Sequence, residues 1–236
     1  DITIGNSTGN ITEAPDPSNS SAKLFESSST PSNVAVIEIK NALGSSTDVR
    51  ILTGQGSSEG GNITWEAGAP IDYSGSSGNL KLDASGYIKI GSDIKTGTGG
   101  LTLNAGAGFV EGTAGTNLIL NGPLEISTGD VDIGTPSGGS QALASTLSGI
   151  GNLTKLGNGR LILSGNNTSW TGNTTVSAGA LRVTTANALG TNAAPTVVES
   201  GASLELSGGI TLDEPITLEG GVLRNWSGNN TLKQTL

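Results

Sequence analysis

The sequence predicts an all-β fold, a solenoid of the parallel β-helix type with about ten coils. Three observations favour this fold. Short runs of alternating apolar and polar residues lie between turns, a leucine motif returns about every 20 residues, and large apolar side chains are scarce. A compact globule needs a thick core, whereas a solenoid buries only thin rows of aliphatic side chains, so the composition favours the solenoid.

The composition also excludes several kinds of chemistry. The 236 residues include 38 Gly, aromatic residues make up 3% and charged residues 13%, and there is no Cys, His or Met. Disulfides, thiolate metal sites and cysteine or histidine catalysis are therefore excluded. We expect no cofactor.

The charge of the chain limits its partners. The formal net charge is −9 and the isoelectric point is about 4.4. Phosphate backbones are bound by clustered Lys and Arg, so we expect no nucleic-acid partner. No apolar run approaches the roughly 20 residues that a membrane helix needs.

The clearest part of the pattern is residues 149–190. Short strands are expected at 153–155, 161–163, 174–176 and 181–183, separated by Gly- and Asn-rich clusters that turn the chain sharply. No run is long enough to enclose a core by itself. Such units are stable when they stack on copies of themselves.

This stretch resembles a known family. N-L-T-K-L-G-N-G-R-L-I-L-S-G-N-N-T from Asn152, followed by W-T-G-N-T-T-V-S-A-G-A-L-R-V from Trp170, is similar to the autotransporter-associated β-strand repeat. The departures are Arg160, where the family usually has Thr, and Ser169-Trp170 near its usual Tyr; neither changes the spacing. The resemblance implies the passenger region of a secreted bacterial exoprotein.

The leucine motif extends the same periodicity along the chain. Its six copies align by eye, and we interpret them as one series with a lost copy between residues 118 and 161, continued by Leu223. Their first leucines are Leu80, Leu101, Leu118, Leu161, Leu181 and Leu204.

A second resemblance covers residues 44–106. Strands at 49–52, 62–65, 80–82, 87–90 and 101–103, with G-N-I-T-W and G-N-L-K-L-D-A among them, look like the coils of filamentous-haemagglutinin-type exoproteins. Both families imply a right-handed parallel β-helix on a bacterial surface, and both imply an outer-membrane transporter as a partner during secretion.

The chain divides into two parts at residue 33. Residues 1–33 are rich in turn residues and read as an N-terminal lead-in segment or loop excursion, and residues 34–236 as a β-helix truncated at its C-terminus. Within the second part, 34–39 is the clearest isolated strand, because four of its six residues are Val or Ile.

Candidate chemistry is sparse. Asp130 and Asp132 flank Val131 and are expected on one outward face of a strand, where a carboxylate pair is either catalytic or simply solvated. Residues 128–134, T-G-D-V-D-I-G, contain one fragment of a glycine-rich calcium repeat; such repeats bind calcium in tandem. We therefore expect neither a catalytic nor a metal site.

Aromatic side chains provide one candidate for glycan contact. Aromatic rings stack on sugars, but here they are scattered, and core packing is the competing interpretation. Stacking of successive coils would place Trp65 and Tyr87 on one face, with Trp170 and Trp226 several coils further on. The candidates are Trp65, Tyr87, Trp170 and Trp226.

The favoured function is a non-enzymatic stalk or adhesin segment of a secreted, surface-displayed exoprotein of a Gram-negative-type bacterium. The resemblance implies a receptor or glycan on a host or neighbouring cell as partner. The alternative is a β-helical carbohydrate-binding or polysaccharide-cleaving protein. A pair of β-sandwich modules would have strands of similar spacing, but not a leucine series near 20 residues.

Overall fold

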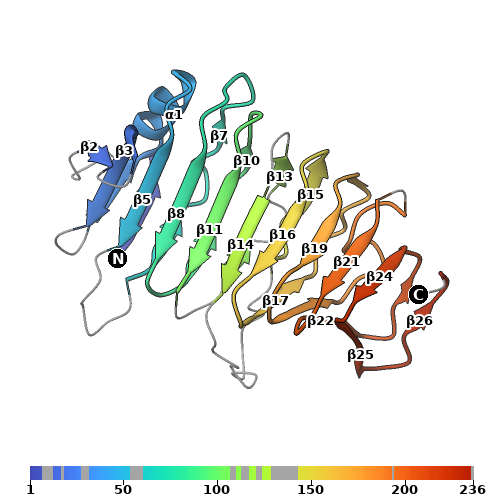
Figure 1. Cartoon of the computed structure of the whole chain (residues 1–236). Helices are drawn as coiled ribbons and strands as arrows, with labels where there is room; N and C mark the ends of the chain where they lie inside the picture. The colour runs from blue at the N-terminus through green and yellow to red at the C-terminus, as the bar shows by residue number, and fades with distance from the viewer. Residues whose placement is uncertain are drawn as a thin grey trace.

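The structure, a computed structural model, describes residues 1–6, 13–16, 19–27, 32–53, 61–106, 110–112, 117–120, 124–128, 143–192 and 194–234. In this part the chain forms an all-β solenoid of parallel, stacked coils with about seven turns. Figure 1 shows the coils side by side from the blue N-terminal end to the red C-terminal end.

One side of the solenoid is a single ten-stranded sheet, called the long sheet below. Apart from β2, which pairs antiparallel with β3, its strands pair in parallel. In spatial order they are β2 (Glu13–Asp16), β3 (Asn19–Ser27), β5 (Val49–Thr53), β8 (Leu80–Ala84), β11 (Leu101–Ala105), β14 (Leu124–Thr128), β16 (Leu153–Leu156), β19 (Thr174–Val176), β21 (Thr196–Glu199) and β24 (Ile216–Glu219).

The strands that alternate with these along the chain form four shorter sheets. Two contain β4 (Ser32–Ala35), β1 (Ile2–Gly5), β6 (Ile63–Trp65), β9 (Ile88–Ile90) and β12 (Val110–Gly112), and then β17 (Arg160–Leu163), β20 (Ala180–Val183), β22 (Ser203–Ser207) and β25 (Val222–Ser227). The other two contain β7 (Ile71–Asp72), β10 (Ile94–Lys95), β13 (Asn117–Leu120), β15 (Thr146–Gly149) and β18 (Ser169–Trp170), and then β23 (Thr211–Leu212) and β26 (Thr231–Leu232).

The coils stack because each coil places apolar side chains at the same inward positions, and these side chains form one continuous core. In the long sheet, Leu80, Leu101, Leu124 and Leu153 are register partners, and all four are fully buried. Neighbouring parallel strands lie about 4.8 Å apart, so these side chains touch directly. Truncating one such leucine to Ala would cost about 2–5 kcal/mol.

The predicted leucine series is correct in its burial but wrong in its register. Leu161, Leu181 and Leu204 are stacked with Leu223 on strands β17 to β25, a different sheet from Leu80 and Leu101. Leu118 lies in a third sheet, where it pairs with Leu147. The series therefore joins three columns of the same core. Between residues 118 and 161, Leu143 bridges in parallel to Leu163 of β17, one coil before that copy of the motif.

The expected ten coils are slightly too many. That number follows from a period near 20 residues, whereas the coils from Val49 to Leu80 and from Leu124 to Leu153 are clearly longer than the coil from Leu80 to Leu101. Longer coils carry their extra residues in connections, which leaves fewer turns for the same chain.

Asparagine side chains reinforce the stacking at coil corners. Asn79 Oδ1 accepts the backbone N–H of Gly100 at 2.8 Å, and Asn152 Oδ1 accepts that of Asn173 at 2.9 Å. Asn167 bonds in both directions, from Leu147 N at 2.8 Å and to Ala188 O at 2.6 Å. These bonds satisfy backbone groups where the chain turns and the sheet hydrogen bonds are interrupted.

The strand expected at 34–39 is wrong beyond its first two residues. After β4, the helix α1 (Val36–Gly44) begins, and the backbone N–H of Ala35 donates to Glu38 Oε2 at 3.3 Å. Ile39, Ala42 and Leu43 are buried, at helical rather than alternating spacing. The helix packs against β4, β5 and β7, so tertiary contacts override the strand preference of Val and Ile.

Strand β1 lies between two strands that are distant from it in sequence. Ile2 pairs with Ser32 of β4 on one side and with Ile63 of β6 on the other. Ile2 donates its N–H to Asn62 O at 2.8 Å, and Ile4 O accepts from Glu66 N at 2.8 Å. The division of the chain at residue 33 stays a prediction, but β1 and β3 on its N-terminal side join the same sheets as the later coils.

Candidate functional site

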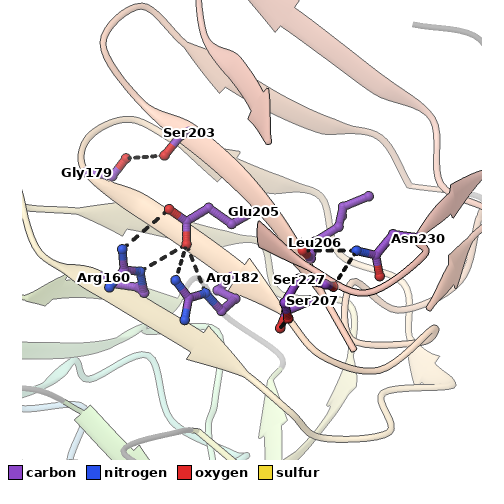
Figure 2. A network of polar contacts seen from close by, with 9 residues as sticks. All are labelled: Arg160, Gly179, Arg182, Ser203, Glu205, Leu206, Ser207, Ser227 and Asn230. Carbon is purple, nitrogen blue, oxygen red and sulfur yellow. Dashed lines mark hydrogen bonds and ion pairs between the residues drawn. The ribbon is translucent and has the colours of Figure 1, made fainter. Parts of the chain in front are cut away.

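The outer face of the four-stranded sheet β17-β20-β22-β25, called the arginine sheet below, carries a compact cluster of charged side chains. Leu161, Leu181 and Leu204 point inward, so the alternation of each strand turns Arg160, Arg182 and Glu205 outward. These three side chains come from successive strands and converge on one point (Figure 2).

Glu205 is the centre of the cluster. Its Oε2 lies 3.0 Å from Arg160 Nε, 2.9 Å from Arg182 Nε and 2.8 Å from Arg182 Nη2. Although Glu205 is on the outer face, only 1% of it is exposed. A carboxylate so far from water requires strong partners, and the two guanidinium groups provide them.

Trp226 covers this ion cluster. The guanidinium carbon of Arg182 lies 3.8 Å from the centroid of the indole, and that of Arg160 lies 4.7 Å away. Both distances are those of cation–π contacts. Trp226 itself is 50% exposed, so the ring shields the ions and still presents surface to solvent.

A cleft of about 290 Å³ opens beside the cluster and is called the arginine cleft below. Arg160, Ser203, Glu205 and Arg224 contribute to its walls, together with turn residues such as Asn158. Arg224 is the register partner of Glu205 on β25 and is exposed. In the described part of the chain no ion pair joins Arg224 to a carboxylate. The cleft and the cluster beside it therefore contain three guanidinium groups and one carboxylate, that of Glu205.

A second cleft, of about 480 Å³, lies toward the C-terminal coils and is called the acid cleft below. Its lining includes Asn187, Thr191, Asp213, Glu214 and Lys233. Asp213 is paired with Lys233 at 3.6 Å, whereas Glu214 is 3% exposed and accepts the Thr196 hydroxyl at 3.1 Å. Burial raises the pKa of Glu214 to about 8, opposed in part by that hydrogen bond, so Glu214 is mostly protonated at neutral pH.

Lys155 is a buried cation that lies in the core rather than at a surface site. It follows Ile126 in the register of the long sheet and is completely buried. Its Nζ donates to the carbonyl oxygens of Leu156, Gly157 and Ala178 at 2.6, 2.9 and 3.3 Å. Burial lowers its pKa to about 8. Since these bonds hold two successive turns together, Lys155 has a structural role.

The structure separates the four aromatic residues considered for glycan contact. Trp65 and Trp170 are fully buried, and their indole N–H groups donate to Ala69 O and Gly151 O, both at 2.7 Å. Tyr87 is partly buried and is not the register partner of Trp65, which pairs with Ile90. Of the four, Trp226 is the residue whose ring faces solvent beside other polar groups.

The other sequence candidates lie outside the described residues. This applies to Asp130, to Asp132 and to residues 129–134 of the calcium-like fragment. Within the described ranges, no group of three or more Asp or Glu residues is arranged to hold a metal ion. No helix of the described part is long and apolar enough to cross a membrane.

Most of the arginine cluster was missed by sequence reasoning. Arg160 was noted because it departs from the repeat pattern, but Arg182, Glu205 and Arg224 were not singled out. Arg182 and Glu205 each occupy the polar position between two apolar residues of a strand, which identifies an outward side chain, whereas Arg224 is followed by Asn225 and lacks this local signal. Their convergence depends on the register of coils that are 23 to 45 residues apart.

The comparisons with known proteins agree with this architecture. Residues 153–183 match the family model of the passenger-associated-transport-repeat. With the stacked coils, the match makes this part of the chain an autotransporter passenger-type repeat region. Neither the curated proteins nor the solved structures contain a significant match to the chain. The likeness of residues 44–106 to filamentous haemagglutinin stays a prediction.

The arginine cluster lies partly within the matched repeat and partly beyond it. The matched residues contain β16, β17, β19 and β20, so they supply Arg160 and Arg182. Glu205 and Trp226 come from the two following coils. The fold and the repeat fit a passenger domain in general terms, a class of secreted or cell-surface proteins of Gram-negative bacteria.

Proposed function

We propose that the chain is a non-enzymatic stalk or adhesin segment of a surface-displayed exoprotein of a Gram-negative-type bacterium. The observation that carries the proposal is the parallel stack of coils that contains a passenger-type repeat. During secretion the chain passes through an outer-membrane transporter, and its partner at the surface is a receptor or glycan on a host or neighbouring cell.

The geometry supports this role physically. A parallel stack of coils places each backbone strand against its neighbours, so the rod resists bending without a thick core. The connections between strands project from the rod, and they differ in length from coil to coil. Such a rod holds its loops and clefts at defined positions away from a cell surface.

Surface display is tested with an antibody raised against the purified chain. We expect the antibody to label intact cells of the source bacterium, and protease added to intact cells to remove the signal. A signal that appears only after the cells are permeabilised would contradict surface display.

Adhesion is tested with beads coated with the purified chain. We expect the beads to attach to animal epithelial cells or to bacteria of the same strain, at least fivefold above beads coated with a Leu153→Asp variant. Leu153 is fully buried, so the variant presents the same composition without the stacked coils. Equal attachment of both kinds of bead would contradict the adhesin role, and the stalk role would then be the one that the fold supports.

A second candidate function, cleavage of a polysaccharide, is favoured by the acid cleft. Glu214, with its raised pKa, is available as a proton donor, and the more exposed Asp213 lies next to it in the chain. Glycoside hydrolysis typically uses one protonated carboxylic acid as proton donor together with a second carboxylate. Depolymerisation of acidic or neutral polysaccharides that is lost in Glu214→Gln would support this function, and no turnover by the unmodified chain would exclude it for the substrates tested.

A further inference from the structure

Trp226 differs in kind from the other two tryptophans of the chain. Trp65 and Trp170 have no exposed surface, and the N–H of each indole is used by a backbone carbonyl. Trp226 is 50% exposed and lies on the outer surface, over Arg160 and Arg182. A large flat ring held in place by two charged groups is a preformed surface for stacking.

The charge around Trp226 is opposite in sign to that of the whole chain. The protein carries 20 acidic and 11 basic residues, yet here Arg160 and Arg182 share a single carboxylate, and Arg224 lines the same cleft. Glu205 is already engaged with the first two. Arg224 is exposed at the arginine cleft and retains its capacity to pair with an anion.

The cation–π contacts also select the kind of ligand. The guanidinium groups of Arg160 and Arg182 already interact with the negative potential of the indole ring. A cationic ligand would therefore be attracted only weakly to the exposed part of the ring. A pyranose ring presents C–H groups that stack on such a surface without a charge of their own. Arg224 and Arg160, at the rim of the arginine cleft, then favour an acidic substituent on that sugar.

We propose that the exposed surface of Trp226 and the arginine cleft bind a saccharide that carries carboxylate or sulfate groups. The sugar ring stacks on Trp226, and its acidic group pairs with Arg224. Hydroxyl and amide groups of the cleft wall, such as Ser203 and Asn158, lie where sugar hydroxyls need partners. The inference deepens the proposed adhesin role and rests on it for its biological meaning, whereas binding itself is measured on the purified chain.

Tryptophan fluorescence provides the test, because Trp226 is the one tryptophan of the three that reaches solvent. The purified chain is titrated with an oligogalacturonate hexamer, a heparin-derived hexasaccharide and neutral maltohexaose. We expect the two acidic probes to change the emission and to protect it from iodide quenching, with maltohexaose binding at least tenfold more weakly. The two acidic probes separate carboxylate from sulfate, and binding of either supports the proposal.

Four variants locate the site. Arg224→Gln should weaken binding of the acidic probe about tenfold without a change in folding, since no ion pair among the described residues involves Arg224. Trp226→Phe keeps a ring beside Arg182 and Arg160 and should bind more weakly than the unmodified chain. Trp226→Ala should lose binding by more than tenfold, which is measured by calorimetry. Lys89→Gln, at an exposed cation on the distant strand β9, is the matched control and should bind normally.

Three results would contradict the proposal. If maltohexaose binds as tightly as the acidic probes, the charge selection is wrong. If no probe binds while circular dichroism shows a folded chain, Trp226 only shields Glu205 and the arginine cleft is no saccharide site. Acidic probes that bind normally to Trp226→Phe, Trp226→Ala and Arg224→Gln would place the site elsewhere. None of these results depends on whether coated beads adhere to cells.

Discussion

The two halves of the solenoid bury different kinds of charge. In the coils up to β14, the buried charged residues of the described part are Asp16 and Asp83, and both lie near Arg50, at 3.8 and 2.6 Å. Arg50 stays 25% exposed. In the coils from β15 onward, buried residues carry both signs: Lys155, Arg182, Glu205 and Glu214.

The difference shows how each half responds to its surroundings. A partly exposed arginine keeps part of its hydration, so the loss of one partner is tolerable. A buried charge depends on its specific partners, because water cannot replace them. We therefore expect the stability of the C-terminal coils to depend on pH and on single charged side chains, and that of the N-terminal coils to depend on apolar packing.

The largest expected effect compares two matched substitutions, Glu205→Gln and Asp83→Asn. Glu205→Gln leaves Arg160 and Arg182 facing each other without their shared carboxylate, and it should lower the free energy of unfolding by about 3–5 kcal/mol. Asp83→Asn should cost about 1 kcal/mol, because Arg50 keeps Asp16 and the solvent. Urea unfolding monitored by circular dichroism measures both. Equal losses of unfolding free energy in the two variants would contradict the proposed difference in charge burial between the two halves.

The sequence predicted the strands well because alternation is a local property. Strands at 153–155, 161–163, 174–176 and 181–183 are confirmed as β16, β17, β19 and β20, and Leu153, Leu161, Leu163, Val176, Leu181 and Val183 of these strands are buried. The parallel solenoid followed from the period of these strands and from the thin core they allow.

What the sequence did not predict depends on contacts between distant coils. The assignment of Leu80 and Leu161 to different sheets requires the length of every connection between them. Helix α1 was missed because Val and Ile favour strands unless tertiary packing decides otherwise. The arginine cluster was missed for the same reason, since the register of β17, β20 and β22 decides which polar side chains meet.

The next effect concerns the apolar half. Ile4→Ala in β1 removes a fully buried side chain between β4 and β6, and it should lower the free energy of unfolding by about 3 kcal/mol. Because no buried titratable group is changed, the loss should be the same at pH 5 and at pH 8. Thermal unfolding at the two pH values is the measurement. A loss that varies strongly with pH would show that apolar packing alone does not hold these coils.

A third effect follows from Lys155 in the C-terminal half. Lys155→Met keeps a similar stem but leaves three carbonyl groups without their donor, and it should cost about 2–3 kcal/mol at pH 7. The pKa of Lys155 is lowered to about 8, so from about pH 8 to 10.5 the folded state is neutral while the unfolded state is charged. The contribution of Lys155 to stability therefore rises with pH across this range. Lys155→Met should lack that rise, which urea unfolding between pH 7 and 10.5 detects; Lys89→Gln, at an exposed lysine, should keep it.

The smallest expected effect comes from Glu214 and has the opposite sign with pH. The pKa of Glu214 is raised to about 8, above its ordinary value of 4.5, so the folded state holds the proton more tightly. The stability that it contributes is complete below about pH 4.5 and is lost as pH rises through 8. Gln resembles the protonated acid, so Glu214→Gln should match the unmodified chain at pH 4 and exceed it by about 2 kcal/mol at pH 6. Asp213→Asn, which changes the more exposed carboxylate next to it, should not reproduce this gain. The contrary result is a stability difference between Glu214→Gln and the unmodified chain that is the same at pH 6 as at pH 4. It would mean that water reaches Glu214 and that this coil behaves like the N-terminal half.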